Sequence, residues 1–311
     1  MKVLSLFDGI SCGMVALSRV GIPVERYVAY EINKYAVEVS KKNFPSIEHK
    51  GDVFGGDFSK YKGFDLLMGG SPCTFWSVLR SGREVTSDGE GGRLFIQYIR
   101  ALRESECRYF LYENNYSIHK DIKDFISDSL GVEPVTINSS LVSAQSRRRC
   151  YWTNIPDVTL PEDKEIKLQD ILEYGVADRE KSSCITCSYA GFQGSQSYKC
   201  RRYFGKRINQ AVFRDSESSD ILRKLWEEDP YFDKDRESPV EEGLIRRMTP
   251  IEVERLQTLP DDYTKGIPEN ERYRCVGNGW TVDVIAHILK GLKKKEETKA
   301  PLIGGLFDLF R

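Results

Sequence analysis

The sequence has no long apolar run and no excess of one charge. No hydrophobic stretch approaches the roughly 18 consecutive apolar residues of a membrane-spanning helix. The opening segment MKVLSLFDGI is apolar only briefly before Asp8 and Gly9, and it lacks the basic segment, long apolar run and cleavage site of a secretory signal. We therefore expect a cytoplasmic protein with no membrane partner.

Neither the net charge nor the cysteine content indicates a specialised class of protein. The 311 residues include 46 Lys and Arg against 47 Asp and Glu, so the net charge of −1 does not by itself indicate a nucleic-acid partner. The eight cysteines are spread along the chain, and we interpret them as thiols, not as a disulfide framework. A hydrophobic fraction of 40% is typical of a soluble globular protein.

The first half of the chain alternates apolar, strand-like segments with amphipathic, helical ones. Strands are predicted over 2–7, 26–31, 64–70, 108–114, 132–138 and 149–154, and helices over 11–20, 33–43 and 93–105. This alternation predicts an α/β fold with a parallel sheet that has helices on both faces. Ligands bind such sheets at the carboxyl ends of the strands, which here carry Asp8, Glu31, Cys73 and Glu113.

The pattern changes between about 176 and 245, where periodicity weakens and Ser, Gly, Tyr and Arg accumulate. After this stretch, Thr249 and Glu252 predict a capping box at the start of a helix, and a last amphipathic helix is predicted over 281–292. We therefore divide the chain into a larger domain of 1–175 and 246–292, an inserted small domain of 176–245, and a charged linker with an apolar tip at 293–311.

Three segments near the strand ends fit a nucleoside site. Gly9 and Gly13 permit a tight turn between a strand and a helix. Glu31 ends the next strand, where carboxylates commonly bind ribose hydroxyls, and Asp52 is placed to accept a hydrogen bond from an adenine amino group. Each has an ordinary alternative as a structural turn or a surface acid. Because GISCG differs from the dinucleotide fingerprint, we favour S-adenosylmethionine as the ligand.

A second group of residues has the chemistry that cytosine methylation needs. Cys73 lies in the loop GGSPCTFWS, and Glu113 ends another strand of the same sheet. Arg147 and Arg149 alternate with Gln145 along one face of an extended segment. Singly, a cysteine is more often a buried hydrophobe and an arginine pair a solvated patch. Together they suit cytosine, because a thiolate that adds to carbon 6 makes carbon 5 nucleophilic, while a carboxyl group and an arginine stabilise the charge that develops.

These motifs, in this order and spacing, resemble those of the C5-cytosine DNA methyltransferase family over about residues 1–290. The late segments RMTPIEVERLQTLPDDY and VGNGWTVDVIAHIL match as well. The likeness is closest to the de novo, eukaryotic-type branch, through LSLFDGI, GGSPC, GRLF and KLQDILEYG. The resemblance implies a stand-alone DNA (cytosine-5-)-methyltransferase of the kind found in restriction-modification, with a Rossmann-like S-adenosylmethionine domain and a target recognition domain over 176–245.

The same resemblance implies roles for individual residues. Catalysis falls on Cys73, Glu113, Arg147 and Arg149. Cofactor contacts fall on Phe7, Asp8, Gly9, Ile10, Gly13, Glu31, Ile32, Asp52, Val53, Pro72, Leu94, Asn278, Gly279 and Trp280. The family usually has Pro-Cys-Gln or Pro-Cys-Asn and Glu-Asn-Val, where this chain has Thr74 and Asn115. We expect Asn115 to make the base pocket more polar.

The neutral total charge conceals a basic lobe within the insert. Residues 179–214 contain eight Lys or Arg and one acid, Glu180, with six interleaved Tyr and Phe. We predict that this lobe binds duplex DNA, with Arg201, Arg202, Lys206 and Arg207 among its contacts, because basic side chains bind phosphates and the target base must leave the duplex to react. A solvated loop is the alternative.

Two further features of the sequence suggest ligands. Cys184, Cys187 and Cys200 have the spacing of a partial zinc site, but no fourth ligand lies near them in the sequence, so no metal is expected. Residues 304–310, GGLFDLF, resemble the short motif by which bacterial proteins bind the sliding clamp, and a short packed helix is the alternative.

Two other functions remain open at this point. A branch of the same family modifies transfer RNA, and the fold does not separate the two substrates. A catalytically silent, DNA-binding homologue would have eroded cofactor or cysteine motifs, and both are intact here. The basic, aromatic insert favours duplex DNA, and in a prokaryotic or viral setting the enzyme would then be associated with the nucleoid.

Overall fold

The computed structural model describes residues 1–77, 82–205, 210–228 and 241–293, and the chain forms two compact units. Unit 1 comprises Met1–Asn138, Arg148–Pro161 and Val282–Arg311, and unit 2 comprises Ser139–Arg147 and Glu162–Thr281. This division assigns residues 250–281 to unit 2. The domain boundaries inferred from the sequence, at 175/176 and 245/246, stay a prediction.

Unit 1 is built on a seven-stranded sheet with the order β3-β2-β1-β4-β5-β7-β6. The strands are β1 (Lys2–Leu6), β2 (Arg26–Tyr30), β3 (Glu48–His49), β4 (Leu66–Gly69), β5 (Tyr109–Asn115), β6 (Val135–Asn138) and β7 (Arg148–Thr153). Six of them coincide with predicted strands to within three residues, and the α/β class is confirmed. Their inward side chains, among them Leu4, Val28 and Leu67, have no exposed surface.

The sheet is mixed, so the prediction of a parallel sheet is wrong at one edge. The strands from β3 to β5 pair in parallel, whereas β7 runs antiparallel to both β5 and β6. The cause is the connection between β6 and β7, residues 139–147, which is shorter than the dozen or so residues that a parallel crossover requires. As a result, the first residues of β7 lie at the edge where β5 ends.

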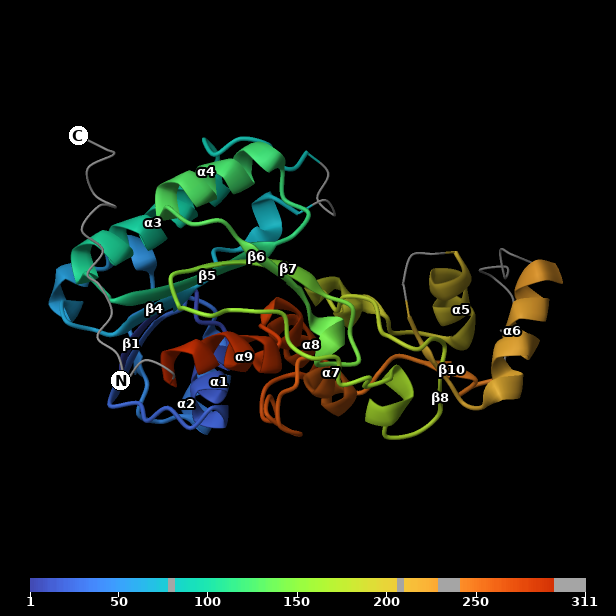
Figure 1. Ribbon diagram of the computed structural model, residues 1–311. Coiled ribbons are helices and arrows are strands. Elements are labelled where there is room, and N and C mark those ends of the chain that lie inside the picture. The colour runs from blue at the N-terminus through green and yellow to red at the C-terminus, as the bar shows by residue number, and fades with distance from the viewer. Residues whose placement is uncertain (78–81, 206–209, 229–240, 294–311) are drawn as a thin grey trace. The chain divides into compact units, whose positions relative to one another are not determined.

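Helices cover both faces of this sheet, as predicted. Figure 1 shows α3 (Glu90–Ser105) and α4 (Lys120–Leu130) on one face. On the other face lie α1 (Cys12–Arg19), α2 (Lys34–Asn43) and α9 (Val282–Lys293). Short 3₁₀ helices follow several strands, including η1 (Val53–Gly55) and η3 (Cys73–Phe75). The sheet therefore leaves its carboxyl edge, where the loops gather, as the place for a ligand.

Unit 2 combines short helices with a small antiparallel sheet. The helices are α5 (Gln196–Phe204), α6 (Ser216–Glu228), α7 (Pro250–Leu256) and α8 (Glu269–Asn278). The sheet has the order β10 (Ile245–Arg246), β9 (Val212–Phe213) and β8 (Val176–Ala177). The predicted capping box of α7 is confirmed, because Glu252 N–H donates to Thr249 Oγ1 at 3.2 Å and Thr249 N–H donates to Glu252 Oε2 at 2.8 Å.

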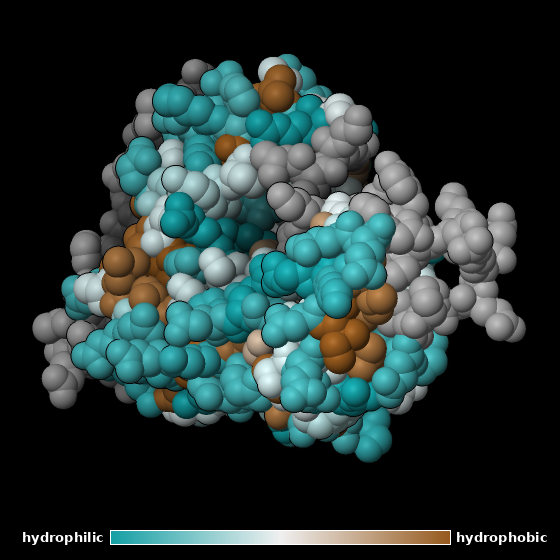
Figure 2. Space-filling view, turned by 90° about the vertical axis from the view of Figure 1, so that its right-hand side faces the viewer, coloured by the Kyte–Doolittle hydropathy of each residue, from teal (hydrophilic) through white to brown (hydrophobic). Residues whose placement is uncertain are grey.

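The polarity of the surface is consistent with apolar side chains being packed inside each unit. The face seen in Figure 2 is mostly hydrophilic, and apolar side chains gather there only in small patches. Across the described parts of the chain, no helix has the length and apolar character needed to traverse a bilayer.

Candidate active site

The loop between β1 and α1 has an unusual backbone that prepares it for a ligand. Phe7, Gly9 and Ser11 all have positive φ, at 55°, 59° and 59°. Only glycine adopts this region without cost, so the two non-glycine residues must be held by their surroundings. Close packing also explains Gly13, where a Cβ would lie 2.7 Å from the Met68 side chain. The loop is thus a fixed turn at the carboxyl end of β1.

The Asp8 carboxylate holds this loop in place. It accepts hydrogen bonds from three hydroxyl groups, those of Ser5 at 2.6 Å, Ser11 at 2.5 Å and Tyr27 at 2.7 Å. Burial raises the pKa of Asp8, while the three hydroxyl donors oppose that rise. Its side chain therefore binds the loop and β2, and it contributes to a ligand site by shaping the turn.

Glu31 joins the end of β2 to the same loop. Its Oε2 accepts from Gly9 N–H at 2.8 Å and its Oε1 accepts from Asn33 N–H at 2.7 Å. Burial raises the pKa of Glu31, and the negative charge of Asp8 raises it further. The next side chain, Ile32, is 78% exposed although it is large and apolar. An oriented carboxylate beside an open apolar side chain suits a ribose and a flat base.

The remaining predicted cofactor residues of unit 1 lie on neighbouring elements. Asp52 caps η1, since its Oδ1 accepts from Phe54 N–H at 3.0 Å, and Val53 is buried. Ile10 is buried within the turn, Leu94 lies half-buried on α3, and Pro72 is exposed. Because β1, β2 and β3 are adjacent in the sheet, the segments that follow them are brought to one edge.

The predicted nucleophile follows β4 in a loop that is bonded to β5. Cys73 is the first residue of η3. Just before it, Ser71 Oγ lies 2.6 Å from the Tyr112 hydroxyl, and the Asn114 side chain donates to Ser71 O at 3.3 Å. Tyr112 and Asn114 were not predicted from the sequence, because their role depends on the pairing of β4 with β5. They fix the loop that carries Cys73.

Two predicted catalytic residues meet across β5 and β7. Arg149 Nε lies 3.0 Å from Glu113 Oε1, and each side chain is 11% exposed. The strand register places Asn115 opposite Arg149. An ion pair of this kind neutralises both charges and fixes the carboxyl group in one orientation.

Arg147 lies in unit 2 and has a different environment. Its Nη1 donates to Ile185 O at 3.0 Å and to Cys184 Sγ at 3.2 Å. Its Nη2 donates to Gly279 O at 3.0 Å and to Gly277 O at 3.3 Å. These bonds account for the four N–H groups on the terminal nitrogens, so the guanidinium ties two distant segments of unit 2 together. The alternation of Gln145, Arg147 and Arg149 in the sequence does not predict these hydrogen-bond partners.

The last predicted cofactor residues lie where α8 ends in unit 2. Asn278 is exposed, Gly279 is buried and Trp280 is partly exposed. Gly279 O also accepts from the Gln257 side chain at 3.1 Å. Gly277 lies so close to Thr186 and Cys187 that a Cβ would come within 2.6 Å of the Thr186 carbonyl carbon. This turn is therefore held rigidly against η6 (Cys187–Gly191).

The predicted DNA contacts are described in part. Arg201 and Arg202 lie on α5, and Arg202 Cζ is 5.9 Å from the ring centre of Tyr198. Lys206 and Arg207, like residues 304–310, lie outside the described residues. Within the described ranges, no three His, Cys, Asp or Glu side chains come together as a metal site would require.

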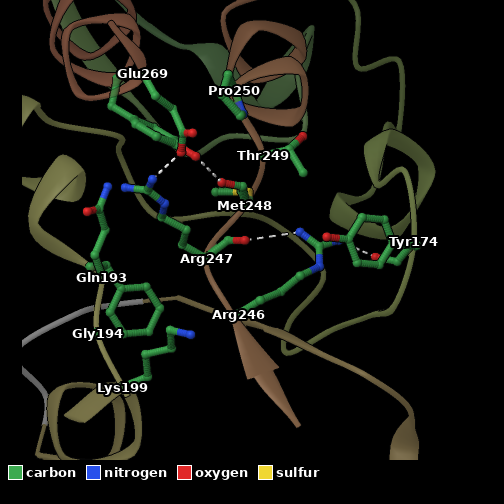
Figure 3. Close-up of a pocket in the computed structure, with 12 residues that line it drawn as sticks. Tyr174, Gln193, Gly194, Lys199, Arg246, Arg247, Met248, Thr249, Pro250 and Glu269 are labelled. Carbon is green, nitrogen blue, oxygen red and sulfur yellow. Dashed lines mark hydrogen bonds and ion pairs between the residues drawn. The ribbon is translucent and has the colours of Figure 1, made fainter. Parts of the chain in front are cut away.

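Unit 2 has a cavity of about 380 Å³ that the sequence did not indicate. Figure 3 shows Arg246 and Arg247 reaching into it from one side, with Lys199 and Gln193 nearby. Arg246 stacks 3.8 Å above the Tyr174 ring, and Arg247 pairs with Glu269. Arg246 also pairs with Glu252 at 2.8 Å, so both arginines are partly neutralised. The cavity lies wholly in unit 2 and contains none of the predicted catalytic residues.

Comparisons with known proteins find that this chain is similar to methyltransferases. The family model for C-5 cytosine-specific DNA methylase matches residues 1–294. A type II methyltransferase of Neisseria gonorrhoeae is 28% identical over 96% of this chain and 96% of its own. An orphan methyltransferase of Bacillus phage rho11s is 41% identical, but the match covers 56% of this chain and 37% of the phage protein.

Solved structures show the same fold. A methyltransferase of Entamoeba histolytica superimposes with a TM-score of 0.69 at 15% identity, over 96% of this chain and 99% of that chain. A DNMT2 mutant of Spodoptera frugiperda superimposes with a TM-score of 0.64 at 19% identity, over 94% and 99% of the two chains.

Proposed function

The chain belongs to the C-5 cytosine-specific DNA methylase family, and from this premise we propose which of its residues carry out each part of the reaction. The enzyme transfers a methyl group from S-adenosylmethionine to carbon 5 of cytosine in DNA. Its cofactor site is the carboxyl edge of β1 and β2. There the Glu31 carboxylate is oriented toward a ribose, and the exposed Ile32 side chain offers an apolar surface to the adenine.

Cys73 is the nucleophile of this proposal. Its thiolate adds to carbon 6 of a flipped cytosine, and the ring electrons then form the bond from carbon 5 to the methyl group, with S-adenosylhomocysteine as the leaving group. Removal of the proton from carbon 5 restores the ring double bond and expels the thiolate. The hydrogen bonds that Ser71 makes with Tyr112 and Asn114 support this assignment, since they fix the loop that carries the thiol.

Glu113 and Arg149 stabilise the base in this proposal. A carboxyl group at ring nitrogen 3 and the exocyclic amine compensates the charge that develops when the thiolate adds. Arg149 holds that carboxyl group and supplies positive charge beside the cytosine carbonyl oxygen. Arg147 remains a predicted catalytic residue, and its four bonds within unit 2 suggest that it acts by positioning the segments at Ile185 and Gly279.

The basic, aromatic part of unit 2 is the proposed DNA-reading surface, with Arg201 and Arg202 on its helix α5. Lysine and arginine there bind phosphates, and neighbouring side chains read base edges. Binding of a sliding clamp by residues 304–310 stays a proposal on the sequence alone. A DNA methyltransferase works where the DNA is, so we place this one at the nucleoid of a prokaryotic or phage-infected cell.

The Glu113–Arg149 pair beside the Cys73 loop is the observation that carries this proposal. The test is a covalent adduct with duplex DNA that contains 5-fluorocytosine, which cannot lose its substituent at carbon 5. We expect a stable adduct that requires S-adenosylmethionine and is absent in Cys73→Ala. Cys187→Ser, which changes an exposed cysteine of unit 2, serves as the matched control and keeps the adduct. An adduct in Cys73→Ala, or faster methylation of transfer RNA than of duplex DNA, would overturn the proposal.

A further inference from the structure

A cluster of positive charge surrounds one exposed aromatic ring just outside the catalytic pair. The ring is Tyr116, which is 41% exposed and directly follows β5. Lys123 Nζ lies 4.3 Å from the ring centre and Arg148 Cζ lies 4.9 Å from it. The two cations come from different elements, α4 and β7, so this is a tertiary arrangement and not a run of basic residues in the sequence.

A third cation, Arg83, reaches the same place from the chain between η3 and α3. Arg83 Nη1 donates to Ser117 O at 2.9 Å, on the residue next to Tyr116. In the described residues, none of Arg83, Lys123 and Arg148 has a carboxylate within ion-pair distance. The nearby acids are engaged elsewhere, since Asp124 pairs with Lys120 and Asp121 lies beside His119. The cluster therefore carries uncompensated positive charge.

The position of the cluster relates it to the reaction. Successive residues of a strand point to opposite faces, so Arg149 is buried against Glu113 while its neighbour Arg148 is exposed. Tyr116 follows Asn115, the register partner of Arg149. The cluster thus lies about one residue, or ~3.3 Å along the strands, beyond Asn115 and Arg149, with Arg148 directed to the opposite face of the sheet from Arg149.

The chemistry of the cluster selects an anion as its ligand. Because both cations contact the Tyr116 ring, they lie closer to each other than one Debye length, which is ~10 Å at 0.1 M salt. Salt therefore screens their repulsion only partly. An anion between them removes that repulsion. Stacking on Tyr116 orients the Arg148 guanidinium, whose planar fork matches the oxygens of a phosphate.

We propose that Arg148 and Lys123, held on the ring of Tyr116, form a phosphate-binding subsite for the DNA strand that carries the target cytosine. This proposal rests on the proposed function, because a flipped nucleotide keeps its flanking phosphodiesters at the rim of the site that takes its base. The subsite fixes the backbone so that the base stays beside Cys73 and Glu113, and it carries no sequence information itself.

The first test is the salt dependence of binding to a duplex, with the full-length enzyme. Each phosphate contact contributes ~0.9 to the slope of log affinity against log salt concentration. Arg148→Gln and Lys123→Gln should each lower that slope by roughly one contact and weaken binding roughly tenfold at low salt. Arg148→Lys keeps the charge and should retain the slope.

The chain offers a matched control at the other end of β5 from Tyr116. Arg108 Cζ lies 5.1 Å from the ring centre of Tyr109 at the start of β5, and Arg108 is exposed like Arg148. It lies at the opposite edge of the sheet, so Arg108→Gln should leave the salt slope, S-adenosylmethionine binding and stability unchanged. A loss in Arg108→Gln equal to that in Arg148→Gln would overturn the proposal, because it would show a general charge effect.

The second test locates the phosphate. After methylated cytosines have been mapped, single phosphodiesters around the target are replaced by uncharged methylphosphonates. At the linkage that the subsite contacts, the methylphosphonate should weaken binding by the wild-type enzyme. It should not weaken binding by Arg148→Gln any further. If the wild-type enzyme binds more tightly than Arg148→Gln at every methylphosphonate position, the subsite is refuted. It is also refuted if Arg148→Gln weakens the binding of RNA but not of the duplex. Failure of the subsite is distinguishable from failure of the proposed function, because the 5-fluorocytosine adduct of the wild-type enzyme and of Cys73→Ala tests that function separately.

Discussion

Arg149 Nε lies 3.0 Å from Glu113 Oε1, and the two side chains are almost completely shielded from water. The pair bridges β5 and β7, which run antiparallel, so the end of one strand meets the start of the other. At such a site the interaction is weakly screened, and each charge depends on the other for compensation. The geometry fixes one carboxyl oxygen of Glu113, which lies on the strand that pairs with β4, against the arginine.

Glu113→Gln should reduce methyl transfer far more than it reduces binding of S-adenosylmethionine. The amide keeps the shape of the side chain but cannot compensate charge at ring nitrogen 3, so we expect kcat to fall by ~10²-fold or more. It also removes the carboxylate that pairs with the buried Arg149, which should destabilise the fold by ~1–3 kcal/mol. Single-turnover methylation and urea unfolding measure the two effects.

A suitable control for this change is Glu25→Gln, which removes an exposed acid of unit 1 that lies 3.6 Å from Lys2. It should keep full activity with little change in stability. Equal activity of Glu113→Gln and the wild-type enzyme would contradict the role assigned to Glu113.

The sequence predicted the elements that have a strong local signal. Buried strands such as β1 and β5 and the amphipathic α3 and α9 were located to within a few residues, because period and composition encode them directly. The turn at Gly9 and the capping box at Thr249 were also evident, since each depends on residues that are close in sequence. The proximity of Glu113 to the loop of Cys73 followed from parallel-sheet geometry alone.

What the sequence did not predict depends on contacts between distant residues. The direction of β7 follows from a short connection, which periodicity does not report. Helices α4 to α6 and α8 were not predicted either, although α4 and α6 have a clear apolar face. The partners of Arg147 lie up to 132 residues away in the chain. For the same reason, the stacking of Lys123 and Arg148 on one ring was invisible before the fold was known.

Arg147→Lys should separate positioning from catalysis. Lysine keeps the charge but presents its donors from one nitrogen, so it cannot satisfy four acceptors on two segments. We expect the free energy of unfolding to fall by ~2–4 kcal/mol, because buried carbonyl groups lose their partners. We also expect a raised KM for S-adenosylmethionine, since Gly279 lies in a predicted cofactor segment.

The matched control is Arg214→Lys, which alters an exposed arginine of unit 2 that pairs with Asp215 and Glu241. It should change stability by less than ~0.5 kcal/mol. If Arg147→Lys is as stable as this control and loses only kcat, Arg147 acts directly on the base and the positioning role is wrong.

Gly277→Ala should destabilise unit 2 although it lies within α8. In an open helix, alanine is favoured over glycine by ~1 kcal/mol. Here the added Cβ would lie 2.6 Å from the Thr186 carbonyl carbon and 2.7 Å from Cys187 N, and backbone atoms cannot move aside cheaply. We expect a loss of ~1–3 kcal/mol in urea unfolding. Gly191→Ala has no atom within 4 Å of its Cβ and should be neutral, so equal stability of the two variants would contradict this account.

Asp8 should make the stability of the protein depend on pH. Burial raises the pKa of Asp8 above its ordinary value of 3.8, so the folded protein favours the protonated form. A carboxyl group with a raised pKa contributes stability below its unfolded pKa, and that contribution is lost as the pH rises through its folded pKa. Relative to Asp8→Asn, which stays neutral, the wild-type protein should therefore lose free energy of unfolding as the pH rises from about 4.

Urea unfolding at a series of pH values measures this difference, and Asp57→Asn supplies a control of opposite sign. The hydroxyl of Ser59 lowers the pKa of Asp57, so the wild-type protein should gain stability over Asp57→Asn as the pH rises toward about 4 and should keep that gain at higher pH. Asp8→Asn also removes a charge that raises the pKa of Glu31, so Glu31 contributes to the difference in the same direction as Asp8. A flat or rising difference between the wild-type protein and Asp8→Asn would show that the three hydroxyl donors outweigh the burial of this carboxylate.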